Sequence, residues 1–265
     1  LNTGQWSNKA LKAARAQGLQ VAVAADESAS NYTTVPAAGS FTIDPAARYL
    51  HYTPNETIGG VEFGYIPDSG EVPLVADFSS AILSEPLDVS RYGLIYAGAQ
   101  KNLGPAGLTV VIVRDDLLDH ARPETPDVFN YRKMADSDSM LNTPPTFGIY
   151  LLGLVLEWVQ RQGGVAAIAA RNRQKAEALY AAIDASRLYH NPVALDARSR
   201  MNVVFTLNDP ELTEGFIADA AKAGLVNLKG HRSVGGIRAS IYNAMSPEGA
   251  GALVAFMKEF EAAHC

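Results

Sequence analysis

Residues 95–107 read IYAGAQKNLGPAG, and this stretch decides the fold that the rest of the chain predicts. A short apolar run ends in small residues, presents one lysine, Lys101, and then turns through glycine and proline. This pattern predicts a buried strand with the lysine at its carboxyl end. Open α/β sheets bind ligands at that edge. Lys101 is therefore a candidate functional residue, with an exposed loop lysine as the ordinary alternative.

Several other short apolar runs end at Asp, Gly or Pro and predict further strands, at residues 20–25, 49–52, 72–76, 94–97 and 108–113. A helix is predicted at residues 6–17, a short one at 115–120, and a long polar loop at 121–143. Strands alternating with helical or turn-rich connections favour an α/β domain with a mainly parallel sheet.

The second half of the chain has a different texture. Its periodicity predicts helices at residues 146–162, 165–185, 211–223 and 247–263, and strands at 201–207 and 236–242. We interpret this half as a smaller α+β domain. The expected division is a large domain at residues 1–160 and a small C-terminal domain at residues 161–265.

Composition limits the possible functions. The 265 residues carry a net charge of −6, which argues against a nucleic-acid-binding surface. No apolar stretch approaches the ~18 residues of a membrane span, and the start, LNTGQWSNKA, does not resemble a signal peptide. Cys265 is the single cysteine, so no intrachain disulfide can form and a reducing, cytoplasmic location is expected.

A second chemical group is expected beside Lys101. Asp77 ends the predicted strand at residues 72–76, so both side chains should reach the same edge of the sheet. A lysine that holds an aldehyde as an imine, facing an aspartate that keeps a pyridine nitrogen protonated, is the pair that pyridoxal phosphate enzymes need. Trp6, at a helix start, is a candidate for stacking on such a ring. The ordinary alternatives are a turn or capping aspartate and a core tryptophan.

Residues 229–238, KGHRSVGGIR, form a basic island on an acidic protein. Three fixed cations and a histidine lie within ten residues that contain no acid. Arginine offers paired hydrogen bonds to carboxylate or phosphate, so the island is suited to a small anionic ligand. A solvated basic turn is the alternative.

Several long motifs resemble the phosphoserine aminotransferase family, among them HYTPNETIGG, SMLNTPPTFGIY, SRMNVVF and LKGHRSVGGIRASIYNAM, together with the residues from ADFSS to IVR. The resemblance covers essentially the whole chain. It implies a homodimeric, pyridoxal-phosphate-dependent transaminase of aspartate aminotransferase-like fold type I. The implied reaction interconverts phosphoserine and 2-oxoglutarate with 3-phosphooxypyruvate and glutamate in serine biosynthesis. A phosphorylated four-carbon substrate of pyridoxine biosynthesis is also implied.

The same resemblance assigns roles to residues in the matching motifs. Lys101 matches the lysine that binds the cofactor, Asp77 the partner of its pyridine nitrogen, and Trp6 the stacking aromatic. Thr57 and Gln100 match cofactor contacts.

Two further sets of residues complete the implied site. Asn142 and Thr143 match a pair that reaches the cofactor phosphate of the other subunit. The substrate's anionic groups are assigned to His231, Arg232 and Arg238, with Arg238 on the α-carboxylate.

The family carries further residues before the motif TGQWS, including a turn that binds the cofactor phosphate and a His-Arg pair for the substrate. We expect the full protein to be longer by roughly a hundred residues, because a parallel sheet lacking its first units exposes apolar surface. Two alternatives stay open: another fold type I transaminase of small amino acids, such as a serine–glyoxylate enzyme, and an inactive fragment that acts as an interaction module. The basic island argues against the first, and a visible cofactor band would separate the second from an enzyme.

Overall fold

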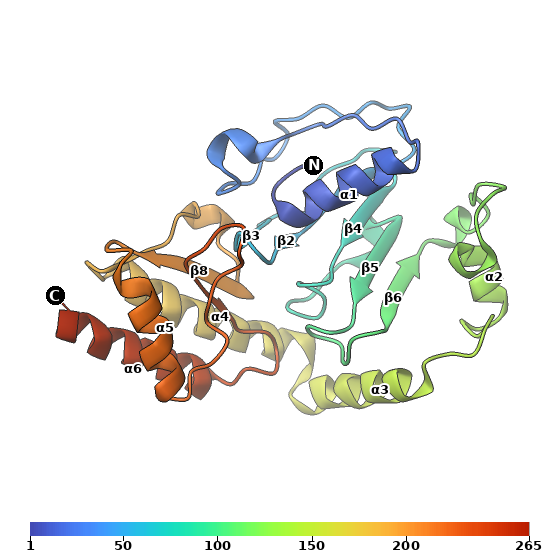
Figure 1. Ribbon diagram of the computed structural model, residues 1–265. Helices are drawn as coiled ribbons and strands as arrows, with labels where there is room; N and C mark the ends of the chain where they lie inside the picture. The colour runs from blue at the N-terminus through green and yellow to red at the C-terminus, as the bar shows by residue number, and fades with distance from the viewer. Residues whose placement is uncertain (265) are drawn as a thin grey trace.

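The computed structural model describes residues 1–264, and Cys265 lies outside the described residues. A four-stranded sheet forms the centre of the first half, in the order β1-β4-β5-β6 (Figure 1). Its strands are β1 (Leu50–Tyr52), β4 (Leu74–Asp77), β5 (Leu94–Gly98) and β6 (Thr109–Val113). The first three are parallel and β6 is antiparallel to β5, so the predicted α/β class with a mainly parallel sheet is confirmed.

The strand register explains why two distant residues meet at one edge. Asp77, the last residue of β4, lies opposite Tyr96 of β5, and Lys101 follows three residues after β5 ends. Alternate residues of both strands, such as Ala76 and Ile95, face the hydrophobic core. The other residues therefore project away from that core, and the edge after β4 and β5 is free to carry polar groups.

Helix α1 (Gln5–Ala16) runs across the top of the sheet in Figure 1. Two short strands, β2 (Asn55–Glu56) and β3 (Val61–Glu62), form a buried antiparallel hairpin between this sheet and the C-terminal half. Isolated two-residue strands of this kind are stabilised by what packs around them rather than by their own ladder. The hairpin therefore depends on both halves of the chain.

Helix α3 (Thr146–Arg161) leads to the C-terminal half, which holds α4 (Gly164–Asp184), α5 (Leu212–Lys222) and α6 (Pro247–His264). These helices accompany an antiparallel sheet in the order β7-β8-β9, made of β7 (Tyr189–His190), β8 (Asn202–Leu207) and β9 (Ile237–Ser240). The core of this half is a separate hydrophobic cluster that includes Phe205, Phe216 and Phe260. Two cores agree with two domains, while the division at residue 160 stays a prediction.

A buried lysine shapes the segment after β9. The Lys175 side chain, on α4, is only 1% exposed, and its ammonium group donates hydrogen bonds to three backbone carbonyls, those of Ile241, Tyr242 and Met245, each at 2.9 Å. Carbonyl oxygens that end a strand need donors when they are buried. Lys175 supplies them and holds this segment against α4.

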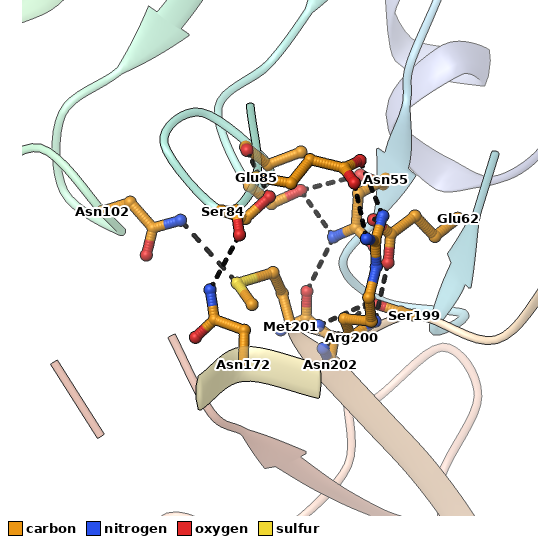
Figure 2. Close-up of polar contacts among 12 residues, drawn as sticks. Asn55, Glu62, Ser84, Glu85, Asn102, Asn172, Ser199, Arg200, Met201 and Asn202 are labelled. Carbon is orange, nitrogen blue, oxygen red and sulfur yellow. Dashed lines mark hydrogen bonds and ion pairs between the residues drawn. The ribbon is translucent and has the colours of Figure 1, made fainter. Parts of the chain in front are cut away.

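A polar network joins the two halves (Figure 2). Arg200 forms ion pairs with Glu62 at 2.5 Å and with Glu85 at 2.6 Å. Asn55 donates to the side-chain oxygen of Asn202 at 2.9 Å. These groups come from the hairpin, from the loop after β4 and from the start of β8, so the contacts fix the C-terminal half against the sheet.

The sequence was misleading at two places. The predicted strand at residues 20–25 is wrong: this segment is extended but mostly exposed, and the backbone bonds next to it join Asn2 to Ala25 and Glu27 at its end. Its alternating apolar pattern finds no neighbouring strand. The predicted loop at residues 121–143 contains helical turns, Asp127–Phe129 and α2 (Tyr131–Asp136). The predicted short helix after residue 114 is a 3₁₀ turn, Asp115–Leu117.

Candidate active site

The site is built around Lys101, in the turn that follows β5. Its ammonium group donates a hydrogen bond to the hydroxyl of Thr57 at 2.6 Å. Burial lowers the pKa of Lys101 to about 8; the charge of Arg238 lowers it further, and Asp77 and Glu56 act in the opposite direction. A lysine with a pKa near 8 is a far better nucleophile and base at neutral pH than an exposed one.

Asp77 lies at the carboxyl end of β4, as the sequence predicts. One of its oxygens accepts a hydrogen bond from the amide of Ser79 at 3.0 Å. Asp77 continues a row of polar groups along this edge, because the hydroxyl of Tyr96 lies 2.9 Å from Nε2 of His51. Burial lowers the pKa of His51 to about 4, so this ring is neutral at physiological pH.

An aromatic ring lies beside the lysine. Trp6 is in the first turn of α1, and the Lys101 nitrogen is 5.5 Å from the centre of its ring. The indole nitrogen of Trp6 is buried and has no hydrogen-bond partner within residues 1–264. The exposed Lys9 lies over the same ring at 4.2 Å. Trp6 is therefore available to contact a planar ligand next to Lys101.

The C-terminal half contributes Arg238 and Tyr242. Arg238 is on β9, and its effect on the pKa of Lys101 places it within electrostatic reach of the amine. Its Nε atom is buried and unpaired in the described part of the chain. Tyr242 lies next to Thr57, and its hydroxyl accepts a hydrogen bond from Asn202 at 3.0 Å. These contacts connect the second half of the chain to the lysine.

Gln100, which precedes the lysine, is exposed. Its side chain folds over the backbone of Gly98, where an added Cβ would lie 2.7 Å from the Gln100 oxygen. Gly98 therefore permits the close approach at the end of β5 that the small residues of this motif predict.

The basic island is less free than its sequence suggests. Lys229 is paired at 3.0 Å with Glu214, an acid from α5 that local sequence counting omits. His231 contacts the hydroxyl of Ser233 at 2.7 Å, and Arg232 is exposed. Of the island's cations, Arg238 is the one that the structure brings near Lys101.

Asn142 and Thr143 lie apart from the other predicted site residues. Both are exposed on the connection between α2 and α3, and the Asn142 amide reaches only the carbonyl of Thr143, at 3.3 Å, among the residues that the structure describes. Nothing within this chain brings the pair to Lys101.

Glu56 and Tyr242 were missed by the sequence reasoning. Glu56 is fully buried, and its carboxylate accepts hydrogen bonds from the amides of Trp6 at 2.9 Å and Ser7 at 2.8 Å. Its position directly before Thr57 was the available signal. Tyr242 had no comparable local signal, because its contacts with Thr57 and Asn202 join distant parts of the sequence.

The assembled groups have a clear chemical capacity. A partly neutral amine, a carboxylate, an aromatic face and an unpaired guanidinium converge on one edge of the sheet. This set can bind a planar, anionic carbonyl compound, attack it through Lys101, and then use the same nitrogen to move a proton. Among residues 1–264, no group of His, Cys, Asp or Glu side chains could hold a metal ion, and no helix is long and apolar enough to cross a bilayer.

Comparison with known proteins gives consistent results. The family described as Aminotransferase class-V matches residues 1–253. The phosphoserine aminotransferase of Azotobacter vinelandii is 56% identical over 264 residues, which cover 100% of this chain and 73% of that protein.

Two solved structures share the fold. That of phosphoserine aminotransferase from Bacillus circulans subsp. alkalophilus is 47% identical, with a TM-score of 0.98 over 100% of this chain and 73% of that one. The pyridoxal-phosphate-bound phosphoserine aminotransferase of Trichomonas vaginalis is 38% identical, with a TM-score of 0.90 over 97% of this chain and 74% of that one.

Proposed function

The chain belongs to the class-V aminotransferases, and from this premise we propose that it transfers an amino group between O-phospho-L-serine and 2-oxoglutarate, giving 3-phosphooxypyruvate and L-glutamate. Membership makes it a pyridoxal-phosphate-dependent transaminase of fold type I. The observation that carries the proposal is the partly buried amine of Lys101, within reach of Asp77, Trp6 and Arg238.

The residues at this edge fit pyridoxal phosphate. Lys101 offers a primary amine for the aldehyde, and Asp77 a carboxylate for the pyridine nitrogen. Trp6 leaves its indole nitrogen unpaired beside the lysine, as expected where a ring is to lie. We assign further cofactor contacts to Thr57 and Gln100.

Bound pyridoxal phosphate supplies an aldehyde for covalent attachment and a ring that accepts electrons from the α-carbon of the substrate. The protein's own residues do the rest. Lys101 Nζ, once free, takes the proton from the substrate's α-carbon and later returns a proton, which a pKa near 8 allows in both directions. Asp77 keeps a proton on the pyridine nitrogen by its charge. Thr57 holds the lysine nitrogen in place through its 2.6 Å hydrogen bond.

Arg238 is the proposed ligand of the substrate α-carboxylate, which both amino acids share. Its buried, unpaired Nε and its closeness to Lys101 support this role. His231 and Arg232 are proposed to meet the second anion, the phosphate of phosphoserine or the side-chain carboxylate of glutamate. A site selective for doubly anionic substrates follows.

We assign this reaction to serine biosynthesis in the cytoplasm. The same anion-binding groups are also proposed to accept 4-phosphohydroxy-L-threonine, a phosphorylated four-carbon substrate of pyridoxine biosynthesis. This compound shares the α-amino acid and the phosphate of phosphoserine, so no additional charged group is required.

A homodimer with shared active sites is the proposed assembly. Asn142 and Thr143 are exposed and contact nothing near their own Lys101. The next segment, α3, is rich in exposed apolar side chains, with Phe147 71% and Tyr150 61% exposed. Exposed apolar surface of this kind is typical of interfaces, and twofold pairing is the commonest assembly. Each subunit would then place Asn142 and Thr143 at the partner's cofactor phosphate.

A spectrum and an activity assay test the proposal together. Pyridoxal phosphate added to the purified protein should give a visible absorption band, and glutamate should form from phosphoserine and 2-oxoglutarate. Lys101→Ala should abolish both, with turnover at least ~10²–10⁴-fold lower because the acid–base group is lost. Lys9→Ala, which removes the other lysine beside Trp6, is the control and should keep both. A Lys101→Ala variant that retained more than a few per cent of turnover would contradict the assignment.

A further inference from the structure

The carboxyl group of Glu56 lies between the hairpin and the start of α1, and the mechanism above does not use it. The side chain is 0% exposed. Its Oε2 accepts the amide of Trp6 at 2.9 Å, and its Oε1 accepts the amide of Ser7 at 2.8 Å and the hydroxyl of Ser7 at 2.7 Å. First-turn amides have no acceptor within a helix, so Glu56 supplies from β2 what the helix cannot supply itself.

Helix α1 has no other device of this kind. Its N-cap residue is Gly4, which has no side chain to accept these amides, and its first turn contains no acid. Gly4 also makes the close approach possible, because an added Cβ would lie 2.6 Å from the carboxyl carbon of Glu56. A buried carboxylate at a helix N-terminus is further stabilised by the positive end of the helix dipole.

The two residues that Glu56 connects are both in the site. Trp6 is in the first turn of α1, with its ring centre 5.5 Å from the nitrogen of Lys101. Thr57, the next residue after Glu56, accepts the hydrogen bond of that nitrogen. The backbone of β2 therefore sets the position of Trp6 through one side chain and of Lys101 through the next.

We propose that Glu56 is a positioning residue of the transamination reaction: its carboxylate fixes the first turn of α1 and so holds the Trp6 ring in place beside Lys101 for contact with the cofactor. The inference rests on the proposed roles of Trp6 and Lys101. It adds the prediction that removing this one acceptor loosens Trp6 without altering any group that touches the cofactor.

The test compares Glu56→Gln with its parent in a Trp158→Phe background, where Trp6 is the only tryptophan. Glutamine keeps the size of the side chain but loses one amide acceptor and the charge. Quenching of Trp6 fluorescence during a titration with pyridoxal phosphate gives the dissociation constant. We expect Glu56→Gln to raise this constant at least ~10-fold, equivalent to ~1.4 kcal/mol, and to reduce the maximal quenching.

A second readout concerns charge. The groups facing Lys101 are Asp77, Arg238 and Glu56, and the charge of Glu56 raises the pKa of the lysine against the lowering effect of burial. The pH midpoint for acylation of Lys101 by acetic anhydride, measured by mass spectrometry, should therefore fall in Glu56→Gln. A residue that only stabilised the fold would not move this midpoint.

Glu62→Gln is the matched control. Glu62 is the other glutamate of the same hairpin, is 5% exposed, and binds Arg200 instead of α1. Its substitution should lower the unfolding temperature but leave the dissociation constant within ~2-fold of the parent. Gly4→Ala provides a second test with the charge intact, since its methyl group would displace the carboxylate. We expect weaker cofactor binding there too, with a smaller change in the Lys101 midpoint.

The outcomes separate the inference from the proposed function. If the parent protein shows no quenching by pyridoxal phosphate, the stacking role of Trp6 is wrong and the inference falls with it. If the parent is quenched but Glu56→Gln binds equally well, or Glu62→Gln is affected as strongly, only the inference is overturned. Should Glu56→Gln fail to fold, unchanged cofactor binding by Gly4→Ala overturns it.

Discussion

The amine of Lys101 should titrate near pH 8 in the cofactor-free protein, and two charged neighbours should move its midpoint in opposite directions. Burial lowers the pKa of Lys101 to about 8, Asp77 raises it, and Arg238 lowers it. Asp77→Asn should therefore lower the midpoint, because a charge that favours the ammonium form is lost. Arg238→Gln should raise it, because a repelling charge is lost.

The size of the effect follows from the pKa itself. At pH 7 about a tenth of a lysine with a pKa of about 8 is neutral, against about 0.03% at the ordinary value of 10.5. The structure thus makes the reactive form of Lys101 about 300-fold more abundant than in an exposed lysine. Each neighbour is expected to shift the midpoint by on the order of one pH unit, which corresponds to ~1.4 kcal/mol.

Competitive labelling with acetic anhydride measures this midpoint directly. The rate at which Lys101 is acylated is followed by mass spectrometry from about pH 6 to about pH 11, a range that spans both limiting pKa values. The exposed Lys12 in the same digest is an internal standard. A wild-type midpoint above pH 10 would refute the argument from burial. Shifts of the same sign in Asp77→Asn and Arg238→Gln would refute the proposed charge arrangement.

Two further predictions concern the substrate and the assembly. Arg238→Lys should raise the KM of both glutamate and phosphoserine, with a loss of ~1.5–3 kcal/mol in kcat/KM because a point charge replaces a paired donor; a loss confined to phosphoserine would reassign Arg238 to the phosphate. Asn142→Ala and Lys101→Ala chains, each inactive alone, should regain up to about a quarter of wild-type activity when mixed and re-paired, because half of random dimers are mixed and hold one intact site. Light scattering that showed an active monomer would contradict the shared site.

The sequence predicted those parts of the site that depend on strand ends. Asp77 and Lys101 each follow a short apolar run, and parallel strands bring their carboxyl ends to one edge whatever the rest of the fold does. Trp6 was predicted by its place at a helix start. A local pattern was sufficient in all three cases, because each residue's position is set by the element that contains it.

The sequence failed where a contact joins distant segments. The charge count over residues 229–238 missed Glu214, which neutralises Lys229 from another helix. The strand predicted at residues 20–25 had a suitable pattern but no partner, and a strand requires one. Glu56 was overlooked because a glutamate in a short strand has no role until the helix that it supports is in place.

Residues 55–57 explain how the two halves of the chain maintain one site. Asn55 binds Asn202 at the start of β8, Glu56 binds the first turn of α1, and Thr57 binds Lys101. Strand β8 pairs with β9, where Val204 lies opposite Arg238. The bond between Asn55 and Asn202 therefore sets the position of the proposed carboxylate ligand relative to the lysine. Since a bidentate contact with a carboxylate tolerates little displacement, a rigid junction at this tripeptide is what allows a substrate held by the C-terminal half to meet an amine held by the sheet.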